Sequence, residues 1–248
     1  MWKRIYLFFH QMASPKYFYR YTGRLMPLIA VASLVSLVWG LYLGLFVAPP
    51  DYQQGQSYRI MFVHVPSAWM SMFIYVFMAL LSGIYLIWNI KLAEIMARSS
   101  AVLGASFTFL ALVTGSLWGK PMWGAWWVWD ARLTSELILL FLYLGYIALI
   151  SAVEDVRVSG RAGSLLLLVG VVNIPIIHYS VEWWNTLHQG PTVTKLDKPS
   201  IHRSMLWPLL LMAIAFQLFY FWLVTLRART ELIWKERRSD WVRSLDMR

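Results

Sequence analysis

The 248-residue sequence contains no cysteine, and this absence excludes several kinds of chemistry. Without cysteine the chain has no disulfide framework, no thiolate metal site and no CxxCH motif for covalent cofactor attachment. Charged residues are also scarce: they make up 14% of the sequence, against about 25% in a usual soluble domain. Hydrophobic residues make up 59%. This composition indicates a membrane protein.

Long apolar runs predict an all-α, multi-pass membrane protein with six transmembrane helices. Each run reaches or approaches the roughly 20 residues that cross the hydrocarbon core of a bilayer. The predicted spans are 25–47, 60–88, 99–117, 135–153, 164–179 and 205–226. We expect residues 1–24 to form a cytoplasmic or interfacial segment, because Trp2, Ile5, Tyr6 and Phe9 recur at helical spacing. Residues 25–226 form the expected membrane domain, and 227–248 a basic cytoplasmic tail.

The basic residues predict the orientation of the chain. Six spans place both termini on one side, and that side collects sixteen of the 22 lysines and arginines. The positive-inside rule therefore places both termini in the cytoplasm. The net charge of +10 is explained by this topology and by lipid headgroups, so we expect a lipid bilayer as partner and no nucleic acid. Segments 48–59, 118–134 and 180–204 face outward in this topology.

Two further absences narrow the function. No GxxxxGK[ST] phosphate loop occurs, so the chain does not hydrolyse ATP by that route. No acidic or basic residue lies in the middle of any predicted span, whereas ion-coupled pumps normally carry such residues at depth. The chemistry is therefore expected at the outer ends of the spans.

A tryptophan-rich outer segment is the first candidate site. Residues 118–130 hold five tryptophans, and Gly119, Pro121 and Gly124 interrupt them, which favours a loop over a continued helix. A dense aromatic belt at the membrane interface is one interpretation. A platform for a flat apolar ring such as a porphyrin is favoured, because a belt needs only one or two tryptophans at each helix end. The five are Trp118, Trp123, Trp126, Trp127 and Trp129.

Cationic side chains flank the outer face and could pair with the carboxylates of such a ring. They are Arg59, Lys120 and Arg132, and arginine can bind a carboxylate through two parallel hydrogen bonds. Arg132 could instead pair with Asp130 or Glu136. Both interpretations stay open on the sequence alone.

Two histidines are expected in the same outer layer. His64 lies near the outer end of the second span, just before Pro66. If the stretch before Gly190 is a short helix, His188 and Trp184 share one face. Two neutral imidazoles can occupy the axial positions of a heme iron, although a single histidine often serves only as a structural hydrogen-bonding group. His178 is a rival ligand, His202 is expected to be solvated, and His10 falls on the opposite side.

These motifs resemble a known family. WGKPMWGAWWVWDARLTSELILLFLYLGY resembles the tryptophan-rich WWD signature of heme-handling proteins. VNIPIIHYSVEWWNTLHQG and DYQQGQSYRIMFVHVP resemble outer segments of the CcmC family of bacterial cytochrome c maturation. The resemblance covers spans one to five and weakens in the first span and after about Pro191.

The resemblance implies a function at the periplasmic face of the bacterial inner membrane. There the protein would bind heme b and present it to the heme chaperone CcmE for covalent attachment. The implied axial ligands are His64 and His188, and the implied heme-binding signature runs from Trp118 to Asp130. Implied partners in an ABC transporter complex are the ATPase subunit CcmA, the membrane subunit CcmB and the small helper CcmD. We expect Trp184 beside the heme, and Arg59 and Arg132 at its propionates.

Three other functions are compatible with the spans. A b-type electron-transfer subunit would hold heme deeper, for example between His64 and His178. A substrate permease could use the aromatic segment as an outer vestibule, but it would need polar groups near the middle of the membrane. An assembly scaffold would bind no heme.

Overall fold

The computed structural model describes residues 14–190, 193 and 198–245, and in these residues it contains helices and no strand. The interfacial pattern predicted for Trp2 to Phe9, and His10, lie outside the described residues. The elements are α2 (Pro15–Tyr42), the π-helix η1 (Leu43–Val47), the 3-10 helix η2 (Ser57–Ile60), α3 (Met61–Trp88), α4 (Lys91–Trp123), α5 (Ala131–Ala152), α6 (Val156–Gly170), α7 (Asn173–Trp183), α8 (Arg203–Lys235) and α9 (Asp240–Arg243).

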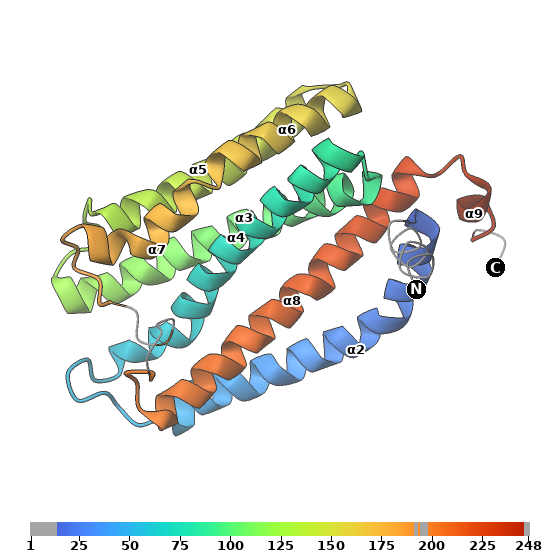
Figure 1. Ribbon diagram of the computed structural model, residues 1–248. Helices are drawn as coiled ribbons and strands as arrows, with labels where there is room; N and C mark the ends of the chain where they lie inside the picture. Colours follow the sequence, from blue (N-terminus) through green and yellow to red (C-terminus); the bar gives the residue numbers. More distant parts are fainter. Residues whose placement is uncertain (1–13, 191–192, 194–197, 246–248) are drawn as a thin grey trace.

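Six stretches of the described chain are long and apolar enough to cross a membrane, as the sequence predicts. In Figure 1 the long helices run side by side, with α2 against α8, α3 against α4, and α5 against α6 and α7. The start of α2 lies beside the end of the described chain: the ring centroids of Tyr19 and Trp241 are 5.7 Å apart. Both ends of the described chain therefore lie at the same end of the bundle.

Several helices are longer than the apolar runs suggest. The first crossing begins at Pro15, ten residues before the predicted span, and α8 continues to Lys235. The third begins at Lys91 and not at residue 99, because Asn89 adopts a left-handed conformation (φ 53°) that ends α3. The added turns are richer in polar residues, so hydropathy alone gives no signal for them.

The fifth crossing is not the single continuous helix that the sequence predicts. It consists of α6 and α7, which meet at Val171 and Val172. Pro175 lies in the first turn of α7 and has no N–H to donate to the carbonyl of Val171, so the helical ladder breaks there. Instead the N–H of Ile174 donates to the Val171 carbonyl at 3.0 Å.

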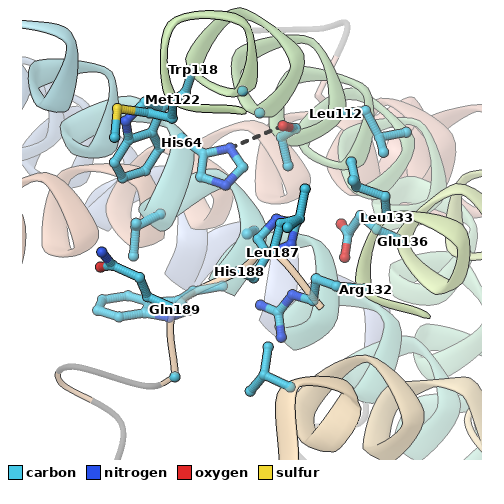
Figure 2. A pocket seen from close by; sticks show the side chains of 18 of the residues that line it. His64, Leu112, Trp118, Met122, Arg132, Leu133, Glu136, Leu187, His188 and Gln189 are labelled. Atoms are coloured by element: carbon cyan, nitrogen blue, oxygen red, sulfur yellow. Dashed lines mark hydrogen bonds between the residues drawn. The ribbon is translucent and has the colours of Figure 1, made fainter. Parts of the chain in front are cut away.

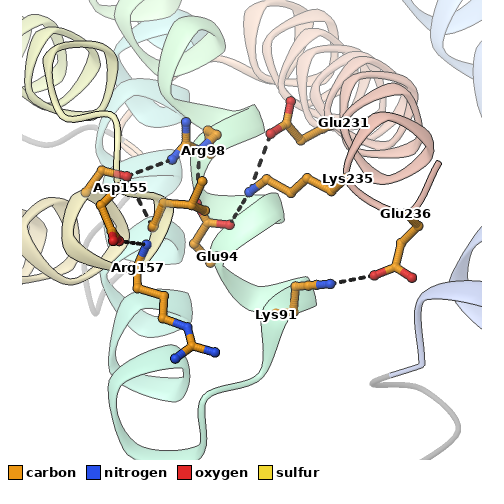
Figure 3. Close-up of polar contacts among 10 residues, drawn as sticks. Lys91, Glu94, Arg98, Asp155, Arg157, Glu231, Lys235 and Glu236 are labelled. Atoms are coloured by element: carbon orange, nitrogen blue, oxygen red, sulfur yellow. Dashed lines mark hydrogen bonds and ion pairs between the residues drawn. The ribbon is translucent and has the colours of Figure 1, made fainter. Parts of the chain in front are cut away.

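Ion pairs join α4 and α8 at the end of the bundle opposite the outer loops (Figure 3). The buried carboxylate of Glu94 lies 2.9 Å from Arg98 Nε and 2.7 Å from Lys235 Nζ. Lys91 and Glu236 form a second bridge between the same helices at 2.5 Å. Because Glu94 and Lys235 are largely buried, losing either partner would leave an uncompensated charge. This cluster fixes the axial position of α4 relative to α8.

Buried tyrosines fix α5 against α3 and α4. The ring of Tyr143 is fully buried, and its hydroxyl donates to the Ser71 carbonyl at 2.7 Å. The ring lies directly over Gly104 of α4, where an added Cβ would stand 2.2 Å from a ring carbon. Only a residue without a side chain permits this approach.

We expect Gly104→Ala to lower the free energy of unfolding by about 1–3 kcal/mol, because the Tyr143 ring cannot move aside in a packed interior. Denaturant unfolding in detergent, followed by circular dichroism, measures this. Gly83→Ala is the matched control, since no atom lies within 4 Å of the Cβ that it adds. Equal stability of the two variants would contradict this account of the α4–α5 contact.

Candidate functional site

A cavity of about 390 Å³ opens among the starts of α3 and α5 and the ends of α4 and α7 (Figure 2). This volume falls within the roughly 300–1,000 Å³ of small-molecule sites. Its lining is mainly apolar and aromatic, with a few polar groups. The polar and aromatic lining residues are Gln54, His64, Trp69, Trp118, Trp123, Arg132, Glu136, His178, His188 and Gln189.

His64 projects into this cavity from the first turn of α3. Its Nδ1 lies 3.0 Å from the Ala111 carbonyl and 3.1 Å from the Thr114 hydroxyl, both on α4. Because a carbonyl can only accept, Nδ1 carries the ring proton and Nε2 keeps the lone pair. Gly115 makes room for the ring, since a Cβ there would stand 3.0 Å from His64 Cε1.

His188 reaches the cavity from the opposite side, but not from a helix. The short helix that would place Trp184 and His188 on one face does not form: α7 ends at Trp183, and residues 184–190 are irregular. The Nδ1 atom of His188 lies 3.3 Å from Asp130 Oδ2. Burial lowers the pKa of His188 below its usual value, and the Asp130 carboxylate partly offsets this effect. A lowered pKa favours the neutral imidazole at neutral pH.

Each of the two histidines contacts a tryptophan of α4. The His64 ring meets Trp118 edge-on, with centroids 5.7 Å apart, and the His188 ring meets Trp123 edge-on at 4.8 Å. The loop predicted from residue 118 onward is wrong for residues 118–123, because α4 continues through Pro121 to Trp123, and Gly124 (φ 76°) caps its end. Trp118 and Trp123 therefore stand on a rigid helix end.

The other tryptophans predicted at the site, Trp126, Trp127, Trp129 and Trp184, lie outside the cavity lining. Trp126 and Trp129 follow the end of α4 and are 56% and 75% exposed. Trp127 packs edge-on against Trp129, with centroids 5.4 Å apart. Trp184 is 50% exposed and packs against Trp183. The tryptophan-rich segment thus divides into two cavity residues on α4 and three residues after it, of which Trp126 and Trp129 are exposed and Trp127 is partly buried.

The structure separates the two arginines predicted to face a carboxylate ligand. Arg132 lines the cavity, and its Nη1 donates to the Ile177 carbonyl at 2.7 Å. Within the described residues it forms an ion pair with neither Asp130 nor Glu136. Arg59 lies outside the lining: its guanidinium donates to the carbonyls of Gly44 and Ala48, each at 2.8 Å.

Asp130 joins the helix framework to the histidine pair. Its Oδ1 accepts from the N–H of Leu133 at 2.8 Å and so caps the start of α5. Its Oδ2 faces His188, as described above. A carboxylate behind an imidazole fixes ring orientation and tautomer. One residue therefore positions both α5 and His188.

Sequence reasoning named Glu136 only as an alternative partner of Arg132, and it missed Gln54, Trp69 and Gln189 as lining residues. Glu136 lies one helical turn beyond Arg132, and its Oε1 is 2.7 Å from the Ser71 hydroxyl. Gln54 enters from the outer loop before η2. The i, i+4 spacing places Glu136 beside Arg132, but no local pattern marks Gln54. His178, the rival ligand, also lines the cavity.

Comparison with known proteins gives a consistent result. A family model described as CcmC, heme exporter protein C, matches residues 8–243. Heme exporter protein C of Escherichia coli K12 is 52% identical over 99% of this chain and 97% of its own length. Its counterpart in Bradyrhizobium diazoefficiens is 49% identical over 92% and 86%. A mitochondrial protein of Marchantia polymorpha, named as ccmC-like and for cytochrome c biosynthesis, is 47% identical over 74% and 79%.

We expect Asp130→Ala to lower the free energy of unfolding by about 1 kcal/mol, because α5 loses its N-cap, while Asp130→Asn keeps most of it. Denaturant unfolding in detergent checks both. Asp155→Ala is the matched control for the loss of a helix cap alone, since Asp155 caps α6 in the same way and lies outside the cavity lining. Equal losses for Asp130→Ala and Asp130→Asn would show that the carboxylate charge, and not the cap, stabilises this corner.

Proposed function

The chain belongs to the heme exporter protein C family, and from this premise we propose that it binds heme b in the outer cavity. His64 and His188 are the proposed axial ligands of the iron. One observation carries this proposal: both imidazoles line one cavity, and each has its Nδ1 engaged by an oxygen acceptor. This leaves the Nε2 atoms for the iron.

The donor set suits an iron that brings its own equatorial ligands. The described residues contain no group of three or more histidine, aspartate or glutamate side chains that could hold a bare metal ion. Two imidazoles fill two positions, and a porphyrin supplies the other four. The apolar and aromatic lining suits the macrocycle, with Trp118 and Trp123 placed to pack against it.

Arg132 is the proposed cationic partner of a propionate. Its Nη1 is held by the Ile177 carbonyl, while within the described chain no acceptor is recorded for its Nε and Nη2. Arg59, with its guanidinium bound to Gly44 and Ala48, is proposed to position the outer loop instead. The exposed Trp126 and Trp129 are proposed to belong to the heme-handling surface outside the cavity.

We propose that the cavity faces the periplasm and that the chain lies in the bacterial inner membrane. The charge bias toward the opposite end supports this orientation. In this proposal the protein holds and orients heme for CcmE, a histidine of which joins a heme vinyl group, and it works with CcmA, CcmB and CcmD. The chain's own contribution is orientation and electrostatics.

Electron transfer by a resident b-type heme is the second candidate, and the position of His178 in the same lining favours testing it. In that case heme would cycle between redox states and never leave. Co-purification with CcmE, followed by a heme-linkage assay on both chains, separates the two functions. Heme joined to the chaperone supports the first, whereas heme that exchanges electrons with a quinone and never transfers supports the second.

We expect His64→Ala and His188→Ala each to convert a six-coordinate, bis-histidine absorption spectrum to a five-coordinate one, and to reduce heme transfer to CcmE. Each substitution removes one axial nitrogen. Absorption spectroscopy of the purified, heme-loaded variants measures this. His202→Ala is the control, because His202 is exposed and outside the cavity lining. Unchanged six-coordinate spectra in both cavity variants would exclude this ligand pair.

We expect Trp118→Ala combined with Trp123→Ala to weaken heme retention roughly tenfold, because two aromatic contacts worth about 0.5–1.5 kcal/mol each are lost. The matched control is the pair Trp88→Ala and Trp207→Ala, which removes two exposed tryptophans that lie outside both the cavity lining and the tryptophan-rich segment. Heme stoichiometry after purification and the heme dissociation rate measure the difference. Equal retention by both pairs would favour a membrane belt as the role of the whole segment.

A further inference from the structure

We propose that Gln54 is a ligand-binding residue of the cavity, which donates its side-chain amide N–H to a carboxylate of the bound porphyrin. This inference rests on the proposed heme-binding function and adds a contact from the outer loop. It also gives Gln54 the role that the sequence patterns suggested for Arg59.

The outer loop holds Gln54 in a fixed position. Asp51 Oδ1 accepts from the backbone N–H groups of Gln53 and Gln54 at 2.9 and 2.8 Å. The backbones of Asp51 and Gly55 exchange two further hydrogen bonds, and Gly55 adopts the positive φ of 57° that this tight turn requires. The Tyr58 hydroxyl donates to the Pro49 carbonyl at 2.6 Å. Gln54 therefore starts from a braced turn and not from a free loop.

The indole of Trp118 sets the orientation of the Gln54 amide. Trp118 Nε1 lies 2.9 Å from Gln54 Oε1. An indole N–H can only donate, so the amide oxygen, and not the nitrogen, must face it. The NH₂ group consequently points elsewhere, and no acceptor for it is recorded in the part of the chain that the structure describes. Gln54 lines the cavity, so this unused donor is available to a ligand there.

The chemistry of the cavity favours a carboxylate as the acceptor. Arg59 already binds two backbone carbonyls, so its guanidinium is occupied within the loop. Arg132 approaches the cavity from α5, and Gln54 approaches from the loop before η2. A porphyrin with two carboxylates can therefore bind the cationic Arg132 with one carboxylate and the neutral N–H donor of Gln54 with the other. A hydrogen bond to a charged group contributes more than one between neutral groups.

The test compares heme with heme dimethyl ester, which lacks the carboxylate charges, in the full-length protein purified in detergent. Gln54→Glu keeps an oxygen acceptor for Trp118 but replaces the NH₂ donor by a negative oxygen. We expect this variant to bind heme about tenfold more weakly or worse, and to lose much less affinity for the dimethyl ester, whose carbonyls are neutral acceptors. Gln53→Glu is the matched control, since it adds the same charge one residue away on an exposed side chain, and it should leave both affinities unchanged.

Each outcome decides between specific roles. Equal weakening for heme and its ester would show that Gln54 acts only by supporting Trp118 and the fold, which overturns the proposal. Unchanged binding of both ligands would overturn it as well. The absorption spectrum of the ester complex reports whether the histidine ligands are still in place in the variant. Failure of the wild type to bind either ring would instead contradict the proposed function itself.

Discussion

The hydrogen bonds at the two Nδ1 atoms are the interactions on which the rest of the site depends. The Ala111 carbonyl fixes His64 and the Asp130 carboxylate fixes His188, so each imidazole keeps one defined tautomer and direction. Neither acceptor lies on the same element as its histidine. The geometry of the pair is therefore set by how α3, α4 and the segment before α5 pack, and not by either histidine's local sequence.

Helix α4 carries most of this arrangement. It supplies the acceptor for His64 and the edge-on partners of both histidines, Trp118 and Trp123. At its other end Glu94 binds Arg98 and the buried Lys235, and in its middle Gly104 receives the Tyr143 ring. These contacts fix the helix along its length, so its outer end can hold two aromatic walls in place without a bound ligand.

The sequence predicts the crossings well because hydropathy reports them directly, and His64 and His188, both expected near the ends of spans, line one cavity. Prediction from the sequence fails where long-range contacts determine the local structure. Pro121 stays inside α4 although it suggests a loop, whereas Pro175 breaks the fifth crossing in two. The sequence cannot show that the guanidinium of Arg59 is bound to the carbonyls of Gly44 and Ala48, because these contacts form only in the folded chain. It also cannot show the orientation of the Gln54 amide, which the Trp118 indole sets.

An experimental structure of the heme-loaded protein in a lipid nanodisc tests the central claim most directly. The account predicts iron between the Nε2 atoms of His64 and His188, with Trp118 and Trp123 against the ring and with each Nδ1 still bound to its present acceptor. Iron held by His178, or through an Nδ1 atom, or a porphyrin lying on the exposed tryptophans outside the cavity, would contradict it.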